Sequence, residues 1–302
     1  DGSVLVNEGY FTKLTNKGEY DESFWFPHGD YPFHGYWIER FDITSDDKIV
    51  VAAKGGVGRF NSDGSYDESF AGGTVDNWWD TNTTDVDVQD DGKVLYAGYF
   101  SQFYQNSGIP DFEGFYPNSL LRLTANGEYD HSFYVGDGPY YSEGSALIFR
   151  VIATPDGGSY VLGQFDSWDG FSAPSGIVKL DQSGSVDFDA QNTLNSQSIY
   201  PYFYMQNDVV ALQNGVALFT NTPALGWAIH RLDEKGNVAA DAPIAAGIDF
   251  YYEISGLSSD VNSLVVLGPV QLADGKVRTV AKVKYSNVRL VRPAEEEEEE
   301  VA

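Results

Sequence analysis

Residues 13–24 read KLTNKGEYDESF, residues 59–70 read RFNSDGSYDESF and residues 122–133 read RLTANGEYDHSF. Each copy begins with a basic residue, places Gly five positions later, Asp three positions after the Gly, and Phe three positions after the Asp. Weaker copies begin at Lys179 and Arg231, and a degenerate sixth copy begins at Lys282. The starting residues lie 46 to 63 positions apart, so the chain is a tandem array of similar units.

A second recurring element precedes each copy, and it consists of two short apolar or alternating runs separated by a tight polar dipeptide. The dipeptides are Asp46-Asp47, Asp91-Gly92, Asp156-Gly157 and Asn214-Gly215. Asp-Gly and Asn-Gly between such runs are strong signals for β-hairpins. No stretch keeps a 3.6-residue apolar period over three turns, so we expect almost no helix.

Two hairpins in each unit of about 45–60 residues are typical of the four-stranded blades of a β-propeller. The sequence therefore predicts an all-β fold, a β-propeller of about six four-stranded blades, over residues 1–292. The expected units lie near residues 1–24, 25–70, 71–133, 134–190, 191–241 and 242–292.

The two ends of the chain give separate expectations. Asp1-Gly2 is a turn dipeptide that leads directly into an apolar run, so we expect the chain to begin inside a structural unit, either after removal of a leader or as a piece of a longer polypeptide. Residues 295–300 are all Glu, and adjacent carboxylates repel one another. We therefore expect residues 293–302 to form a disordered acidic tail.

The repeated charges are expected to form ion pairs between neighbouring strands. In a three-residue hairpin loop that ends in a left-handed Gly, the residues that flank the loop pair outward. Counting from each Gly gives the pairs Lys13–Asp21, Arg59–Asp67, Arg122–Asp130 and Lys179–Asp187. Such cross-strand pairs stabilise a sheet by roughly 0.2–1 kcal/mol each. A ring of catalytic or metal-binding carboxylates is the alternative, but a carboxylate paired with a cation is poorly placed for either role.

The repeat resembles the delta-60 repeat, a β-propeller family of bacterial surface proteins and some phage structural proteins. The turns at Asp91-Gly92-Lys93 and Asp156-Gly157, together with the segments that end at Phe24 and Phe70, carry the resemblance. It covers nearly the whole chain and fades in the last two units, where Ala239 and Leu290 replace the repeated Asp. The resemblance implies a scaffold and not a chemistry.

Composition excludes several classes of protein. The chain has 302 residues, a net charge of −27 and no Cys, so it has neither a disulfide framework nor a thiolate metal site. So acidic a chain repels nucleic-acid phosphates, and without an apolar run of about 18 residues we expect no membrane insertion. Aromatic residues make up 15% of the chain, which is far too many for a disordered protein.

Long, aromatic loops are the expected binding surface. In an up-and-down blade the tight turns fall on one face of the propeller, and the long connections, here near 25–36, 71–82, 101–119, 134–147, 164–175, 190–203 and 242–251, fall on the opposite face. Rings of Trp, Tyr and Phe suit sugar rings and protein surfaces. The candidate ligand-binding residues are Trp25, Tyr31, Tyr36, Trp78, Trp79, Phe103, Tyr104, Tyr140, Tyr141, Trp168 and Tyr202.

The sequence carries little that indicates catalysis. His131 and His230 occupy repeat positions, while His28 and His34 flank one aromatic loop without the spacing of a zinc protease. Asn61, Asp63, Ser65 and Asp67 alternate like oxygen ligands, but turn chemistry explains them, and we expect no cofactor beyond loosely bound calcium.

Three functional hypotheses follow. The first is a non-catalytic module outside the cytoplasm, on a cell surface or a virion, which recognises glycan or a neighbouring protein and belongs to a larger fibre or tail assembly. The second is a glycan-cleaving hydrolase or lyase on the same scaffold, since two carboxylates at a suitable distance are sufficient for that chemistry. The third is a purely structural spacer in which the aromatic residues are all core.

Overall fold

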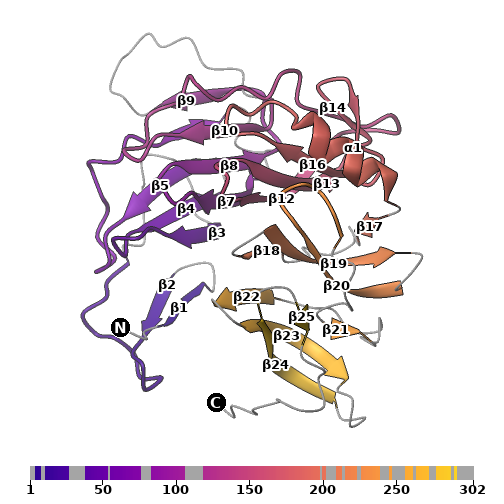
Figure 1. Ribbon diagram of the computed structural model, residues 1–302. Helices are drawn as coiled ribbons and strands as arrows, with labels where there is room; N and C mark the ends of the chain where they lie inside the picture. The colour runs from indigo at the N-terminus through magenta and orange to yellow at the C-terminus, as the bar shows by residue number, and fades with distance from the viewer. Residues whose placement is uncertain are drawn as a thin grey trace. The chain divides into compact units, whose positions relative to one another are not determined.

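The computed structural model describes a chain built almost entirely of short antiparallel strands (Figure 1). The residues that it describes are 4–7, 11–26, 38–53, 55–75, 83–105, 118–197, 199–201, 209–212, 215–222, 226–238, 245–246, 256–260, 263–271, 277–286 and 289–290. The chain divides into two compact bodies. The first body comprises residues 1–139, 147–151 and 183–185, and the second comprises residues 140–146, 152–182 and 186–302.

The first body contains three sheets, with strand orders β1-β2, β3-β4-β5-β6-β9 and β10-β8-β7. Its strands are β1 (Val4–Asn7), β2 (Phe11–Leu14), β3 (Ile38–Ile43), β4 (Ile49–Ala53), β5 (Gly56–Phe60), β6 (Gly73–Val75), β7 (Thr83–Val88), β8 (Val94–Gly98), β9 (Phe103–Gln105) and β10 (Leu120–Leu123). Apolar side chains of successive sheets pack into two buried clusters, one around Phe60 and one around Tyr96. Strands β4, β5, β8 and β10 are buried along their whole length, as expected for the middle strands of packed sheets.

The second body contains the sheets β12-β13-β16, β11-β14-β15, β17-β19-β20-β21 and β22-β23-β24-β25, with β18 also paired to β19. Strands β11 (Pro139–Tyr140) and β12 (Leu147–Ala153) begin in the first body. The remaining elements are β13 (Ser159–Gln164), β14 (Ser167–Trp168), β15 (Phe171–Ser172), β16 (Ile177–Leu180), α1 (Phe188–Ser196), β17 (Tyr200–Pro201), β18 (Val209–Leu212), β19 (Gly215–Thr222), β20 (Gly226–Leu232), β21 (Ala245–Ala246), β22 (Gly256–Asp260), β23 (Ser263–Gln271), β24 (Val277–Ser286) and β25 (Arg289–Leu290).

In three of the units the first hairpin turns at the polar dipeptide that the sequence indicated. Asp47, Gly92 and Gly157 have φ of 61°, 81° and 80°, so each occupies the left-handed region at the end of a three-residue loop. The amide of each donates to the carbonyl three residues earlier, at 2.8–3.0 Å. Gly adopts this conformation without steric cost, and Asp is among the few other residues that tolerate it.

The second hairpin has the predicted register but a shorter return strand in five units, whereas in the sixth Leu290 pairs with Tyr285 instead of Lys282. In five copies the returning strand is reduced to a single antiparallel bridge: Leu14↔Tyr20, Phe60↔Tyr66, Leu123↔Tyr129, Leu180↔Val186 and Leu232↔Val238. The loops between them end in left-handed Gly18, Gly64, Gly127, Gly184 and Gly236. We call these five segments the repeat turns, and each is named by its Gly. The residue after the bridged Tyr or Val donates its amide to the carbonyl of the basic residue that begins the copy, as Asp67 does to Arg59 at 2.9 Å.

The chain after each of the first three repeat turns docks on the following repeat turn. Trp25 N donates to Asp63 O at 3.0 Å, Ala71 N to Asn126 O at 2.9 Å, and Tyr134 N to Ser183 O at 2.8 Å. We call the donor segments Asp21–Trp25, Asp67–Ala71 and Asp130–Tyr134 the repeat tails. In each tail the Asp carboxylate accepts from the amide and the hydroxyl of the Ser two residues later, which closes a tight turn before the Phe.

Glycine is required at the docked repeat turns for a reason beyond backbone conformation. A Cβ at Gly127 would lie 2.8 Å from the amide nitrogens of Ala71 and Gly72 and from the Phe70 ring. A Cβ at Gly184 would lie 2.8–3.0 Å from the backbone of Tyr134. Each Gly therefore lets the backbone of the preceding tail approach the turn closely.

Helix α1 takes the place of a repeat tail in the second body of a chain for which we expected almost no helix. Asp187, at the position of the repeated Asp, accepts from Ala190 N at 3.1 Å and so caps the helix instead of closing the tail turn. The backbone of Ala190 then lies directly over Gly236. The helix thus occupies the same position over its repeat turn that a tail occupies elsewhere.

A glutamine supplements the docking at two repeat turns. The Gln105 side chain donates to Gly127 O at 3.3 Å and accepts from Tyr129 N at 3.4 Å. The Gln197 side chain, after α1, donates to Gly236 O at 2.6 Å and accepts from Val238 N at 2.8 Å. Gly127 and Gly236 are equivalent positions, so two unrelated segments supply the same pair of hydrogen bonds.

Candidate functional site

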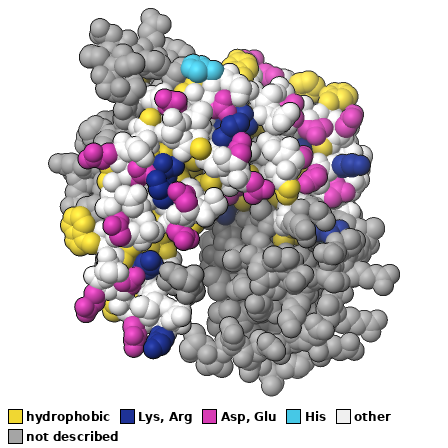
Figure 2. All heavy atoms as spheres, turned by 60° about the vertical axis from the view of Figure 1, so that its left-hand side comes forward, with side chains coloured by type: hydrophobic (Ala, Val, Ile, Leu, Met, Phe, Trp, Pro, Cys, Tyr) yellow, Lys and Arg dark blue, Asp and Glu magenta, His cyan; other side chains and the backbone are white. Residues whose placement is uncertain are grey.

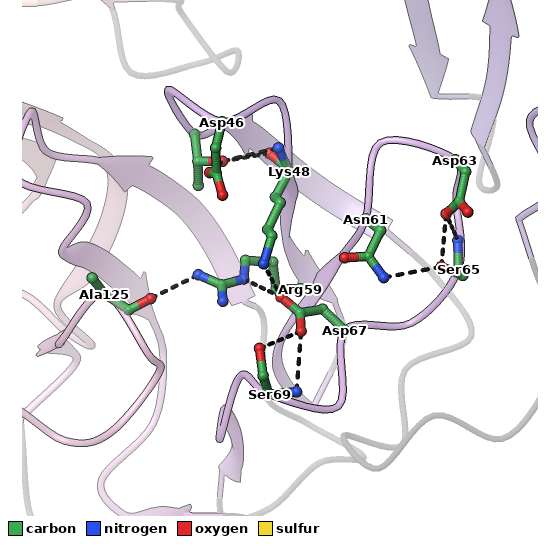
Figure 3. Close-up of polar contacts among 10 residues, drawn as sticks. Asp46, Lys48, Arg59, Asn61, Asp63, Ser65, Asp67, Ser69 and Ala125 are labelled. Atoms are coloured by element: carbon green, nitrogen blue, oxygen red, sulfur yellow. Dashed lines mark hydrogen bonds and ion pairs between the residues drawn. The ribbon is translucent and has the colours of Figure 1, made fainter.

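The repeated charges form buried clusters, the most complete of which surrounds Asp67 (Figure 3). Arg59 Nε lies 2.8 Å from Asp67 Oδ2, and Lys48 Nζ lies 2.9 Å from the same oxygen. Ser69 occupies the other carboxylate oxygen through its amide and hydroxyl. The Arg59 guanidinium also donates to Ala125 O at 2.7 Å and lies 4.6 Å from the centre of the Phe70 ring.

This cluster favours a charged but chemically inert carboxylate. Burial alone would raise the pKa of the Asp67 carboxyl, but hydrogen bonds from Ser69, Lys48 and Arg59 outweigh it and hold that pKa well below its ordinary value. A general base for catalysis needs a pKa near the working pH and a free lone pair aimed at substrate. Asp67 has neither, so its role is to join two strands and the next repeat turn.

The expected pairs Arg122–Asp130 and Lys13–Asp21 are also present. Arg122 Nε lies 2.8 Å from Asp130 Oδ2, with the Phe133 ring 4.7 Å from the guanidinium. Lys13 Nζ lies 3.7 Å from Asp21 Oδ2, and both side chains are partly exposed. The second pair is longer and more solvated, so it contributes less to stability.

The expected pairing of Lys179 with Asp187 is wrong. Lys179 is fully buried, and its amino group lies 2.9 Å from Asp156 Oδ2 and 2.9 Å from Thr154 Oγ1. The cause is Gly158, which stands where the preceding units have Lys48 and Lys93, both partners of the repeated Asp. A Cβ at Gly158 would lie 2.5 Å from Lys179 Nζ, so the missing side chain makes room for the ammonium group.

Acidic side chains are scattered over the face of the molecule drawn in Figure 2. Figure 2 shows Asp and Glu side chains spread over the whole described face, several of them directly beside Lys or Arg. Among the described residues, no group of three or more His, Asp or Glu is arranged to hold a metal ion.

Two carboxylates on the first strands of their units, the buried Asp85 and the half-buried Asp42, were missed by sequence reasoning. Asp85, on β7, lies 2.9 Å from Arg150 Nη1 and accepts from Val151 N at 2.8 Å. Asp42, on β3, accepts from Val88 N at 2.7 Å and from Ile43 N. Burial raises the pKa of both carboxyls. These contacts join the first strands of neighbouring units, and the alternating runs that contain these residues were the only signal in the sequence.

The strongest candidate for a recognition site is a small sheet made from two of the long loops. Strands β11, β14 and β15 form it, and β14 and β15 are joined by a two-residue turn in which Asp169 and Gly170 both have positive φ, 46° and 78°. We call it the loop sheet. Its hairpin could have been predicted, because Asp-Gly between two aromatic residues is a strong hairpin signal.

Asp166 holds the two loops of this sheet together. Its amide donates to Tyr140 O at 3.0 Å, and its carboxylate accepts from the Ser142 amide at 2.8 Å and from the Ser142 hydroxyl. Ala173 N donates to Asp166 O at 2.8 Å. The hydrogen bonds from Ser142 lower the pKa of the Asp166 carboxyl, so this contact stays intact at neutral pH.

Aromatic rings project from the loop sheet and from the adjacent helix. Tyr140 is 62% exposed and Phe171 is 40% exposed. Phe188, the first residue of α1, is 58% exposed, and its ring lies 5.9 Å from that of Phe171 in an edge-to-face arrangement. Tyr141 is partly exposed, with its hydroxyl 3.4 Å from Glu143. Asn195 donates to Ser172 O at 2.7 Å, which joins α1 to β15.

Two of the predicted ligand-binding residues belong to the core. Phe103 and Trp168 are both fully buried, so neither ring is available to a ligand. Phe103 packs in the cluster around Tyr96, and Trp168 packs 5.5 Å from the Phe165 ring. An aromatic residue in a loop can anchor that loop as readily as it can face solvent, and nothing in the local sequence separates the two.

The other predicted aromatics divide between exposed positions and undescribed segments. Trp25 is 67% exposed and Tyr104 is 38% exposed, both in the first body. The loop aromatics that lie outside the described residues are Tyr31, Tyr36, Trp78, Trp79 and Tyr202.

The remaining candidates have local partners or lie outside the described residues. His131 contacts the Tyr129 ring at 5.1 Å, and His230 is buried. His28 and His34 are not among the described residues. In the run that resembles an oxygen ligand set, Asn61 donates to Ser65 Oγ, and Ser65 donates to Asp63 through its amide and hydroxyl. These are the contacts of a tight turn.

Comparison with known proteins identifies the architecture. Residues 89–133 match the model of a family described as a domain of unknown function (DUF5122) beta-propeller. A search of curated protein sequences found no match. The matched segment spans the turn at Asp91-Gly92 and the copy that begins at Arg122, the two elements from which the propeller was inferred.

The solved structures to which this chain is similar differ widely from it in sequence. The extracellular domain assigned to a hybrid two-component system of B. thetaiotaomicron is 12% identical, with a TM-score of 0.51, over 95% of this chain and 35% of that one. A protein of unknown function from Bacteroides caccae is 10% identical, with a TM-score of 0.49, over 96% and 92% of the two chains. BamB from Moraxella catarrhalis is 12% identical, with a TM-score of 0.43, over 96% and 75%. The chain thus spans about a third of the B. thetaiotaomicron domain.

The prediction of an all-β propeller is confirmed, because the described residues form almost only strands and residues 89–133 match a β-propeller model. The number of blades, and the more specific likeness to the delta-60 repeat, stay predictions. No helix among the described residues has the length and apolar character needed to cross a bilayer.

Proposed function

We propose that this chain is a non-catalytic recognition module that binds a glycan, or failing that a neighbouring protein, through the aromatic residues of its long loops. The observation that supports this most directly is the large aromatic surface that Tyr140 and Phe171 expose on the loop sheet and Phe188 exposes on the adjacent α1. Loops held rigidly by a scaffold are where binding residues concentrate.

The loop sheet is suited to binding because its rings are held in place before a ligand arrives. Asp166 fixes the relative position of the two loops, and Asn195 fixes β15 to α1. Side chains that are already ordered lose little conformational entropy on binding. The edge-to-face contact between Phe171 and Phe188 restricts both rings in the same way.

A glycan is the favoured ligand because polar groups surround these rings. Aromatic faces stack on the apolar faces of sugars, while carboxylates, hydroxyls and amides accept or donate to sugar hydroxyls. Glu143, Asp169 and Ser172 supply such groups within or beside the loop sheet. A protein partner would use the same rings as anchors in an apolar pocket of its own.

The proposed setting is outside the cytoplasm, on a cell surface or a virion. The absence of Cys and the charge of −27 are compatible with an exposed, soluble module. The similar B. thetaiotaomicron structure is an extracellular domain, which accords with this setting.

A glycan array provides the test. We expect the full chain to bind a defined set of glycans at low salt, and we expect Tyr140→Ala and Phe171→Ala each to weaken that binding at least tenfold, which is about 1.4 kcal/mol. Tyr20→Ala is the matched control, because Tyr20 is 77% exposed but lies on a repeat turn, and it leaves binding unchanged.

Other outcomes select the other hypotheses. Release of new reducing ends from a bound glycan supports a glycan-cleaving enzyme. Binding to a protein partner that depends on Tyr140 and Phe171, with no glycan bound, supports the protein ligand. If the two loop variants behave like Tyr20→Ala in every assay, the recognition function is wrong and the structural spacer remains.

A further inference from the structure

One repeat turn carries the dipeptide Asn126-Gly127, which is chemically labile. The amide nitrogen of Gly in an Asn-Gly pair can attack the side-chain carbonyl carbon of the Asn, because Gly has no side chain to obstruct the approach. Of the five repeat-turn glycines, only Gly127 follows an Asn. Asn126 is exposed, so solvent reaches its side chain, and Asn is among the thermolabile residues of proteins.

The turn itself holds both of the groups that would react. Gly127 N donates to Thr124 O at 2.8 Å, and Asn126 Oδ1 accepts from Thr124 Oγ1 at 2.5 Å. In a turn of this class the residue before the left-handed Gly has ψ of about 0°, which directs the Gly nitrogen away from the Asn side chain. Ring closure therefore requires a large rotation about the bond between Cα and the carbonyl carbon of Asn126.

The docked repeat tail Asp67–Ala71 opposes that rotation. Ala71 N donates to Asn126 O at 2.9 Å, and the Arg59 guanidinium donates to Ala125 O at 2.7 Å (Figure 3). The tail backbone packs so closely on Gly127 that a Cβ there would lie 2.8 Å from the Ala71 nitrogen. A rotation about the Cα–C bond of Asn126 would carry its carbonyl oxygen away from Ala71, so the reaction requires the tail to detach first.

We propose that Asn126 is a deamidation site controlled by the repeat tail Asp67–Ala71. Asn126 reacts only while that tail is detached from the repeat turn, and the isoaspartyl product then hinders the tail from docking again. The proposal does not depend on the recognition function of the loop sheet. It rests on contacts that are all present among described residues of the first body.

The reaction needs no reagent other than water. Gly127 N gives its proton to a solvent base, its electron pair forms a bond to Asn126 Cγ, and the side-chain nitrogen takes up a proton and leaves as ammonia. Water then adds to either carbonyl of the five-membered succinimide, and opening of the ring gives aspartate or isoaspartate. In isoaspartate the main chain runs through the former side-chain methylene and is one carbon longer, which displaces the carbonyl that accepts from Ala71 N.

Peptide mapping by mass spectrometry tests the proposal. Trypsin cleaves after Arg122 and Arg150, and the peptide 123–150 contains Asn126 as its only Asn and no Gln, so deamidation of that peptide reports on Asn126 alone. The full chain is incubated at mildly alkaline pH beside a synthetic peptide of residues 123–132. We expect Asn126 to deamidate at least about tenfold more slowly in the folded chain, because only the open fraction reacts.

Two variants separate detachment of this tail from a general loss of stability. Phe70→Ala removes the buried ring that anchors the tail, and we expect it to accelerate deamidation of Asn126 at least about tenfold. Phe133→Ala is the matched control, because Phe133 is equally buried but belongs to the tail that docks at Gly184, and we expect it to leave the rate unchanged. Urea midpoints are measured for both variants, and Phe70→Leu, with a smaller acceleration in the same direction, takes the place of Phe70→Ala if that variant does not fold.

Hydrogen exchange of the product tests whether the tail can dock again. Isoaspartyl protein is separated from the unmodified chain by anion exchange, and the Ala71 amide should exchange faster in it, while the Tyr134 amide of the next tail should not change. Equal deamidation rates in the folded chain and the peptide, equal acceleration by Phe70→Ala and Phe133→Ala at matched urea midpoints, or unchanged exchange at Ala71 would each overturn the proposal.

Discussion

The contact between a repeat tail and the next repeat turn predicts an unusually large effect of one methyl group at Gly127. In Gly127→Ala, the left-handed φ of 82° costs about 1–2 kcal/mol for any residue with a Cβ. The new Cβ would also lie 2.8 Å from two backbone amides and from the Phe70 ring. Backbone amides cannot move aside as a flexible side chain can, and overpacking of this kind costs about 1–3 kcal/mol. The expected loss in free energy of unfolding is therefore about 2–5 kcal/mol.

Gly92→Ala separates the two contributions to this loss. Gly92 lies in the same body with nearly the same φ, 81°, but its Cβ would meet only the Ala125 methyl, at 3.2 Å. Urea unfolding followed by circular dichroism should show Gly127→Ala to be less stable than Gly92→Ala by about 1–3 kcal/mol, at equal m-values. Equal losses in the two variants would mean that backbone conformation alone requires glycine, and the docking argument would be refuted.

Four further predictions concern single side chains. Arg122→Met should lower the free energy of unfolding by about 3–5 kcal/mol in urea titrations, because it leaves the buried Asp130 without its closest cation. The pKa of Asp130 is lowered in the folded state, so its stabilising contribution is present above about pH 4 and is lost as the pH falls below that value. In Asp130→Asn the urea midpoint should therefore decrease less between pH 6 and pH 3 than it does in the unmodified protein. Gln197→Leu should cost about 1–3 kcal/mol by leaving Gly236 O and Val238 N without their partner, measured as a shift in the unfolding midpoint. Trp168→Phe should cost about 1–3 kcal/mol, because it removes part of a fully buried ring and leaves a cavity, while glycan binding should be unaffected; loss of binding would return Trp168 to the recognition site.

The turns were the most predictable part of this fold. Each of these turns needs a residue with left-handed backbone conformation at one position, and that position fixes the register of the two strands that the turn joins. The Gly residues of Asp91-Gly92, Asp156-Gly157 and each repeat supply it. The pairing of Arg59 with Asp67 and of Arg122 with Asp130 follows from that register by counting. Local chemistry was sufficient here because the interacting residues lie only eight positions apart.

Lys179 could not be placed in the same way, because its position depends on a residue from another hairpin. The sequence shows Lys48 and Lys93 in two units and Gly158 in the third, but the consequence appears only once β13 and β16 are paired. Helix α1 was missed for a similar reason. Its nine residues are too short for an apolar period to be recognised, and Asp187 serves equally well as the residue of a tail turn and as a helix N-cap.

Which of the loop aromatics are exposed could not be predicted from the sequence. Tyr140 and Trp168 lie in two loops of one unit and end up on neighbouring strands of the loop sheet, yet one is 62% exposed and the other is fully buried. Burial is decided by the side of a two-residue strand on which a ring falls, and no period can be read from so few residues.

Helix α1 shows that a repeat turn contacts the main chain of the segment that packs on it, whatever the sequence of that segment. A tail and a helix satisfy it equally, and glutamines from two unrelated segments supply the same hydrogen bonds. Very different sequences can therefore serve on the donor side, whereas the contact itself requires glycine on the acceptor side at Gly64, Gly127, Gly184 and Gly236.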